Sequence, residues 1–233
     1  MRIETDQTIV ITGGAGGIAG AVAEVFADAG ARLALVDLEG DTLRERADRL
    51  GAVAAAADLT DPDATRAALR SVADEVGGID GLIHTTGGFA MAPADELDTD
   101  LYQKMLDLNL RTLVVTYSAV LPGMLEAGGG FLAAFAAGPA WHRSGGAGMS
   151  IYAAAKHAVS GYVHAVQDEL GDRGIRTAVV YPMGVVDTPG NRASMPDADR
   201  SGWIDPAEIG RALLFAATRG PRGRLTELPV FGG

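Results

Sequence analysis

The chain has 233 residues and contains no cysteine, few aromatic residues (6%) and only two lysines among its 19 basic residues. The lack of cysteine excludes disulfides, thiolate catalysis and Cys-ligated zinc or iron–sulfur centres. The 30 acidic residues give a formal net charge of −11, which argues against a nucleic-acid partner because phosphate binding needs a basic face. We find no metal-ligand spacing among the histidines and carboxylates, so we predict no metal site.

Targeting and membrane signals are also missing. The first seven residues carry acidic side chains where a signal peptide carries basic ones. The longest apolar run, residues 131–141, is interrupted by Gly138 and Pro139 and falls far short of the roughly 20 residues that a membrane-spanning helix needs. We therefore expect a cytoplasmic protein without a membrane partner.

What the sequence has in abundance is alanine (41) and glycine (32), which favour helices packed closely on a sheet over an aromatic-rich sandwich or barrel. Short apolar runs alternate with helical spacing from end to end. This alternation predicts a single domain, residues 1–233, with a doubly wound Rossmann-type α/β fold and a parallel sheet of about seven strands covered by helices on both faces. Strands are expected at 8–11, 32–36, 52–57, 79–84, 131–136, 175–181 and 225–230; helices are expected at 18–26, 41–50, 63–76, 101–125, 149–170 and 206–218.

One of these assignments and one unassigned segment need comment. The run 52–57 is almost all alanine and would prefer helix on intrinsic grounds, but its place between a helix and Asp58 fits a strand. Residues 182–205 form the longest segment without a regular pattern, and such segments in compact domains are usually lids or binding loops.

A glycine-rich turn, Thr12–Ala19, joins the first predicted strand to the first helix. Bare backbone N–H groups and the helix dipole at such a turn favour a pyrophosphate. Asp37 ends the second strand 20 residues after Gly17, where a carboxylate accepts hydrogen bonds from both ribose hydroxyls of an adenosine. It should repel a 2′-phosphate by about 4 kcal/mol at 4 Å before screening. Because no Arg or Lys lies in the turn or beside Asp37 in the sequence, we predict NAD(H) in preference to NADP(H).

Tyr152 and Lys156 are four residues apart in a predicted helix, so their side chains project from one face. A nearby ammonium lowers the pKa of a tyrosine, which would make Tyr152 a proton donor or acceptor near neutral pH. Hydride transfer to a carbonyl or imine requires such a group. The pair therefore indicates an oxidoreductase acting on a small-molecule substrate.

Together, Thr12-Gly-x-x-x-Gly17-Ile18, Asp58-Leu59, Asn109, Tyr152-x-x-x-Lys156 and the terminal Gly232-Gly233 resemble the short-chain dehydrogenase/reductase superfamily over nearly the whole chain. The resemblance implies that Lys156 also holds the nicotinamide ribose and that Asn109 maintains a proton-relay water. It implies a homodimer or homotetramer, with the helices at 101–125 and 149–170 as interface candidates. The implied cofactor contacts are Gly13, Gly17, Ile18, Asp37, Leu38, Asp58, Leu59, Thr86, Gly87, Tyr152, Lys156, Pro182, Val185 and Thr188.

Several positions depart from the family pattern. His84-Thr85-Thr86-Gly87 stands where the family has Asn-Asn-Ala-Gly, and the chain is one residue longer between Pro182 and Thr188. The serine that polarises the substrate oxygen is absent, and its position falls at Ala136 or Ala137. Ser144 or Ser150 would be a substitute, although Ser150 is equally suited to cap the following helix.

The loop from Asp187 to Trp203 and the run Gly148-Met-x-x-Tyr152 resemble dihydropteridine reductase and its bacterial relatives, which also lack that serine. Quinonoid dihydropteridine, whose conjugated ring needs no polarised ketone, is therefore a candidate substrate. The alternatives are a reductase of ordinary alcohols, keto-steroids or 3-oxoacyl thioesters, and a non-catalytic NAD-binding protein. Candidate substrate contacts are Ala136, His142, Ser150, Met195 and Trp203.

Overall fold

The computed structural model describes residues 7–142, 146–220 and 222–233. Seven strands form one parallel sheet in the order β3-β2-β1-β4-β5-β6-β7, which confirms the predicted doubly wound α/β fold. The order reverses between β1 and β4, and the carboxyl ends of the strands at such a switch point form the usual ligand crevice. The strands are β1 (Thr8–Thr12), β2 (Arg32–Asp37), β3 (Val53–Ala56), β4 (Gly81–His84), β5 (Gly130–Phe135), β6 (Ile175–Pro182) and β7 (Glu227–Val230).

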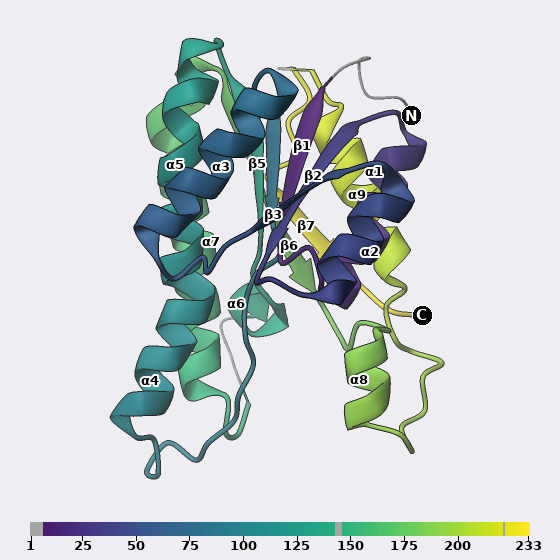
Figure 1. Ribbon diagram of the computed structural model, residues 1–233. Coiled ribbons are helices and arrows are strands. Elements are labelled where there is room, and N and C mark those ends of the chain that lie inside the picture. The colour runs from purple at the N-terminus through teal and green to yellow at the C-terminus, as the bar shows by residue number, and fades with distance from the viewer. Residues whose placement is uncertain (1–6, 143–145, 221) are drawn as a thin grey trace.

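Helices cover both faces of the sheet (Figure 1). One face carries α1 (Gly17–Asp28), α2 (Asp41–Leu50) and α9 (Pro206–Ala217), and the other carries α3 (Pro62–Val76), α4 (Thr99–Leu106), α5 (Thr112–Glu126) and α7 (Ser150–Leu170). Asp61, Asp98 and Asp205 cap α3, α4 and α9 by accepting backbone N–H bonds in the first turn.

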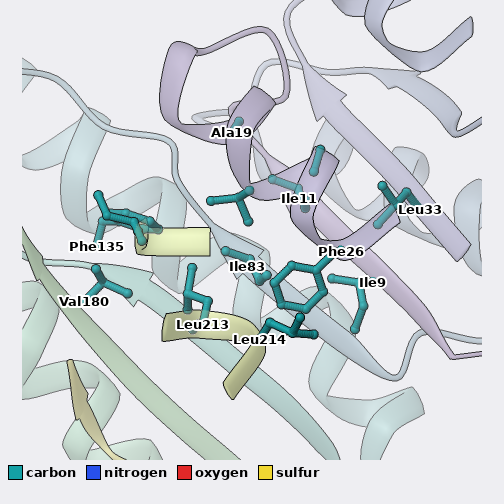
Figure 2. Packing of buried hydrophobic residues seen from close by; sticks show 14 of the residues in the cluster. Ile9, Ile11, Ala19, Phe26, Leu33, Ile83, Phe135, Val180, Leu213 and Leu214 are labelled. Carbon is teal, nitrogen blue, oxygen red and sulfur yellow. The ribbon is translucent and has the colours of Figure 1, made fainter. Parts of the chain in front are cut away.

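Each sheet face has its own apolar core. In the core under α1 and α9, the ring of Phe26 lies among Ile9, Ile83 and Leu214 (Figure 2). The small residues allow this packing: a Cβ on Gly210 of α9 would lie only 3.0 Å from Cγ2 of Val25 on α1. Part of the glycine excess is therefore explained by close helix contact.

Three segments differ from the sequence expectation. The helix predicted at 101–125 is interrupted by a π-helical turn, Asp107–Arg111, between α4 and α5. Residues 182–205 are not wholly irregular, because they contain the short helix α8 (Pro189–Ser194) and a parallel bridge between Val186 and Ile204. Instead, residues 85–98 form a long stretch without helix or strand. Two short elements were not predicted: α6 (Gly138–His142) and a 3-10 turn, Gly171–Arg173.

By length and composition alone, the run Thr99–Glu126 is long and apolar enough to cross a membrane. Its side chains nevertheless contribute to the protein core, since Met105, Leu113, Tyr117 and Met124 are all buried. The run is a core element: α4 and α5, with the π turn between them, pack against α3, β5 and α7.

Candidate active site

The glycine-rich turn leads directly from β1 into α1. Gly13 has φ +67°, a conformation that favours glycine, and a Cβ there would lie 2.7 Å from Oγ1 of Thr85. No side chain caps α1 at Gly16, so the first backbone N–H groups of the helix, from Gly17 and Ile18 onward, have no side-chain acceptor there. An uncapped helix start behind a tight glycine turn fits the pyrophosphate of a dinucleotide.

Asp37 lies at the carboxyl end of β2, beside the turn. Its Oδ2 accepts the N–H of Ala15 at 2.9 Å, and its Oδ1 accepts the N–H of Leu38 at 2.7 Å. The neighbouring strand end is tied to it, because Ala57 N–H donates to the Asp37 carbonyl at 2.8 Å. Three other predicted cofactor contacts lie nearby. The side chain of Leu38 is exposed, and Leu59 is buried in the core. Asp58 is exposed, and its Oδ1 accepts the N–H of Thr60.

An arginine does reach the turn, contrary to the expectation from the sequence. Arg46 of α2 donates from Nη1 to the carbonyls of Gly14 and, at 2.7 Å, Gly16. Burial and the charge of Arg49 lower the pKa of Arg46, while the charges of Glu24 and Asp37 oppose that change. The guanidinium also packs on Gly20, where a Cβ would lie 2.8 Å from it. Arg46 therefore braces the turn from the α2 side.

Asn109 and Lys156 meet at Gly87, after the end of β4. A Cβ on Gly87 would lie 2.8 Å from Oδ1 of Asn109 and 3.2 Å from Nζ of Lys156. The Asn109 amide donates to the carbonyls of Gly88 and Met105 at 3.0 and 2.9 Å, and its Oδ1 accepts the N–H of Gly88 at 3.2 Å. Asn109 is fully buried in the π turn, so this turn is what aims its side chain at the β4 loop.

Tyr152 and Lys156 lie one turn apart on α7, as predicted. Nζ of Lys156 is 5.9 Å from the centroid of the Tyr152 ring and donates to the carbonyl of Phe135 at 2.8 Å. Burial raises the pKa of Tyr152 to about 12 and lowers the pKa of Lys156 to about 8. The predicted lowering of the Tyr152 pKa is thus wrong for this arrangement, because desolvation of the phenol dominates. Tyr152 is a protonated phenol at neutral pH.

The departure at His84–Thr86 forms a buried hydrogen-bond network. Nδ1 of His84 lies 2.9 Å from Oγ1 of Thr12, and its Nε2 lies 3.2 Å from Oγ1 of Thr112. The hydroxyl of Thr85 donates to the Thr12 carbonyl at 2.7 Å, and that of Thr86 bonds Thr12 Oγ1 at 3.1 Å. Burial, reinforced by the charge of Lys156, lowers the pKa of His84 to about 3, so the imidazole is neutral.

The loop after β6 packs against the glycine turn. A Cβ on Gly17 would lie 2.8 Å from Cβ of Thr188, whose Oγ1 caps α8. Val185 is half-buried in this loop, and Pro182 ends β6. Among the predicted contacts of this loop, Thr188 is therefore one that packs on the turn.

An apolar hollow of about 650 Å³ lies between the segment 91–94 and the segment 146–150, which leads to Tyr152 along the chain. The two segments that form it are joined by the N–H of Ala92, which donates to the Gly148 carbonyl at 2.9 Å. Phe89, just before the first segment, sets its ring edge-on to the Tyr152 ring. The lining consists of Met91, Ala92, Pro93 and Ala94 on one side and Gly146, Ala147, Gly148 and Ser150 on the other.

Only some of the predicted substrate contacts lie at the hollow. Ser150 begins α7 and lines the hollow, and Ala136 is buried just after β5. Three others do not line it: His142, which is exposed at the end of α6, and Met195 and Trp203, which follow α8. The side chain of Trp203 instead stacks with Arg200, whose guanidinium carbon is 5.8 Å from the ring centroid. Ser144 and the first six residues lie outside the described residues.

Residues 7–199 match the family model of the short chain dehydrogenases. The chain is 34% identical over 230 residues to D-threitol dehydrogenase of Mycolicibacterium smegmatis, an alignment that covers 91% of this chain and 86% of the relative. Levodione reductase superposes with a TM-score of 0.89 at 26% identity, covering 98% and 97% of the two chains. A short chain dehydrogenase of Burkholderia cenocepacia in complex with NADP superposes with a TM-score of 0.88 at 30% identity, covering 98% of each chain.

The protein belongs to the short-chain dehydrogenase/reductase family and is an oxidoreductase of that family. Members of this family bind nicotinamide cofactors. The residues that could hold one here are the glycine-rich turn, Asp37, and the side chains of Asn109 and Lys156 that meet at Gly87.

Reasoning from the sequence missed Arg46, Phe89 and Met91 as site residues. In the sequence, Arg46 cannot be told apart from the other charged residues of an amphipathic helix. Phe89 and Met91 lie in a stretch without periodicity, so no regular element places them. One signal was available for Phe89 and Met91: two large apolar side chains in an otherwise small and polar loop are exposed unless they have a partner.

Proposed function

We propose that this protein is an NAD(H)-dependent reductase that acts on a carbonyl or conjugated imine group of a small substrate with an apolar body. The observation that carries the proposal is the convergence of Asn109 and Lys156 at Gly87, one helical turn from Tyr152. The three side chains come from the π turn and α7, and Asn109 and Lys156 meet beyond the carboxyl ends of β4 and β5. Open α/β sheets bind ligands at this edge.

The nicotinamide cofactor, when bound, supplies the hydride. Tyr152 supplies the proton: its high pKa keeps the phenol protonated at neutral pH, so it can donate to an oxygen or nitrogen that gains negative charge. The buried ammonium of Lys156 stabilises the phenolate that remains, and it can hold ribose hydroxyls by hydrogen bonds. Asn109 fixes the position of the loop after β4 next to Lys156 through its three hydrogen bonds to Gly88 and Met105.

The proposed preference for NAD(H) over NADP(H) rests on Asp37. A carboxylate at the end of β2 binds ribose hydroxyls and repels a 2′-phosphate. Arg46 is near enough for its charge to act on Asp37, but its described hydrogen bonds go to the carbonyls of Gly14 and Gly16, which hold the guanidinium against the turn. The Burkholderia relative was solved with NADP, so the preference is a feature proposed for this chain rather than for the family.

We infer the substrate class from the hollow formed by the segments 91–94 and 146–150. Its lining side chains are methionine, proline, alanine and one serine, which suit an apolar body better than the hydrogen-bonding edge of a pterin. The absent hydroxyl at Ala136 and Ala137 still favours a carbonyl or imine polarised by conjugation, and quinonoid dihydropteridine remains the second candidate on that ground. Ser150, at the rim of the hollow, is the described hydroxyl best placed to substitute.

The active form is proposed to be a cytoplasmic homodimer or homotetramer. Tyr102 of α4 and Val114 of α5 expose apolar surface on the predicted interface helices, with 44% and 36% of each residue accessible. Light scattering of the purified protein tests this point, and a monomer at assay concentration would contradict it.

The test of function is NADH oxidation with a substrate panel: conjugated cyclic ketones, cyclic imines, quinonoid dihydropteridine, keto-steroids and 3-oxoacyl thioesters. We expect turnover with conjugated, apolar substrates and a loss of at least 100-fold in Tyr152→Phe. Tyr162→Phe, on the same helix but outside the site, is the matched control and should keep full activity. Tight NADH binding by calorimetry without turnover of any substrate would instead support a non-catalytic NAD-binding protein.

A further inference from the structure

The hydrogen bonds through His84 all run in one direction, and that direction is fixed by Thr112 of α5, where the chain ends. The hydroxyl of Thr112 donates to the Leu108 carbonyl at 2.9 Å, and a carbonyl only accepts. That hydroxyl has one proton, so Thr112 Oγ1 must accept from Nε2 of His84, 3.2 Å away. Nε2 of His84 therefore carries a proton.

The other side of the ring follows from the neutral state of the imidazole. A neutral histidine has one N–H, so Nδ1 of His84 is an acceptor and receives the proton of the Thr12 hydroxyl at 2.9 Å. Thr12 Oγ1 must then accept from Thr86, 3.1 Å away. The proton of Thr86 is used within the protein, and the free lone pairs on its oxygen remain.

Thr86 lies beside the groups that would hold the cofactor, so its free lone pairs can accept a hydrogen bond from it. It is half-buried, it precedes Gly87 at the Asn109–Lys156 cluster, and it is bonded to Thr12, the residue that opens the glycine turn. We propose that His84, fixed as the Nε2–H tautomer, is a positioning residue that makes Thr86 a hydrogen-bond acceptor toward a ribose hydroxyl of the cofactor. The inference rests on the proposed function, because it requires a nucleotide at this edge of the sheet.

Thr112→Val removes the acceptor for Nε2–H while keeping the shape of the side chain. The imidazole is then free to place its proton on Nδ1 and donate to Thr12, whose hydroxyl turns toward Thr86. Thr86 must in turn point its own proton at the cofactor. The variant should show the Nδ1–H tautomer by ¹H–¹⁵N NMR and bind NADH three- to tenfold more weakly by calorimetry, the loss of about one neutral hydrogen bond. Thr112→Ser should restore both properties.

Two further variants separate this role from mere support of the fold. Thr116→Val removes another buried hydroxyl of α5, one that donates to the Thr112 carbonyl at 2.5 Å, and should change neither the tautomer nor NADH affinity. Thr86→Val should weaken NADH binding by itself, and adding Thr112→Val to it should have no further effect. Additive losses in the double variant would overturn the role assigned to Thr86.

The outcomes distinguish this inference from the proposed function. An Nδ1–H tautomer or a protonated His84 in the unchanged protein at pH 7 overturns the present inference alone. Failure of the unchanged protein to bind NADH overturns both the proposed function and the cofactor contact. Equal NADH affinity in Thr112→Val and the unchanged protein, despite a switched tautomer, removes the link between His84 and Thr86.

Discussion

The ring of Phe89 lies edge-on to the ring of Tyr152, with the centroids 4.9 Å apart and the planes at 82°. Phe89 comes from the irregular segment 85–98 and is itself 60% exposed, so it shields one side of the Tyr152 ring. Edge-to-face pairs of this kind contribute about 0.5–1.5 kcal/mol beyond the area they bury. The contact links the chemistry of Tyr152 to the loop that forms the apolar hollow.

Phe89→Ala should therefore change both acidity and substrate binding. Removing the ring exposes the phenol, so the pKa of Tyr152 should fall from about 12 toward its usual value near 10, measured by ultraviolet titration against Tyr152→Phe. KM for an apolar substrate should rise about three- to tenfold. Phe231→Ala removes an equally exposed ring, 63% accessible, and should change neither quantity. Unchanged KM in Phe89→Ala would separate the hollow from the substrate site.

The rate of reduction should be set at high pH by Lys156 rather than by Tyr152. Burial lowers the pKa of Lys156 to about 8, so its charge is present below that pH and lost as the pH rises through it. Tyr152, with a pKa near 12, stays protonated throughout this range. We expect kcat/KM for NADH oxidation to be level between pH 6 and 7.5 and to fall above about 8. Lys104→Gln, which changes the other, exposed lysine, should leave the profile unaltered. A fall that begins only above pH 10 would contradict the assignment.

Asp37→Ser should relax the discrimination between cofactors. The substitution removes the carboxylate that would repel a 2′-phosphate but keeps a small hydrogen-bonding side chain. We expect the ratio of kcat/KM for NADH to that for NADPH to fall by 10- to 100-fold, mainly through better use of NADPH. Asp41→Ser, at the exposed start of α2, is a control for the loss of one negative charge near the turn. If Asp41→Ser shifts the ratio as much as Asp37→Ser, general surface charge rather than Asp37 sets the preference.

Tyr117→Phe should stabilise the protein. The hydroxyl of Tyr117 is buried in α5 and has no hydrogen-bond partner among the described residues. An unsatisfied buried hydroxyl costs about 1–3 kcal/mol, so its removal should raise the free energy of unfolding by about 1 kcal/mol and Tm by about 2–4 °C. Urea unfolding measures the change, with Tyr162→Phe, whose ring lies 6.0 Å away, as the comparison. A decrease in stability would mean that the hydroxyl has a partner.

The fold could be predicted because its determinants are local. Buried parallel strands are continuous apolar runs, and the β1–α1 turn is marked by glycines whatever surrounds it. The almost all-alanine strand β3 (Val53–Ala56) was recognised from its place in the alternation, even though alanine prefers helix. The positions of Asp37, Tyr152 and Lys156 could be predicted in the same way, because a strand end and helix periodicity fix where their side chains project. Asn109 was predicted only from the family resemblance, and the π turn that orients it was not predicted.

The rest of the site depends on contacts between distant segments. Arg46 and the turn it braces are 30 residues apart, and the sequence alone does not place α2 beside Gly16. The pKa of Tyr152 depends on how completely Phe89 and the core exclude water, so the Tyr–Lys spacing led to the wrong direction of shift. The role of His84 requires Thr12 and Thr112, which only the assembled sheet and α5 bring to opposite sides of one ring.

The π turn Asp107–Arg111 makes α4 and α5 differ in angular phase. A wide turn of this kind is equivalent to one extra residue in an otherwise continuous helix, and one residue corresponds to a rotation of about 100° around the axis. Deleting a single residue here would let the helix run straight but would rotate everything before it. Met105 would leave the core and the amide of Asn109 would turn away from Gly88. The geometry of the candidate site therefore depends on the number of residues in this segment, and insertions or deletions should be tolerated far less here than in the loop 195–203.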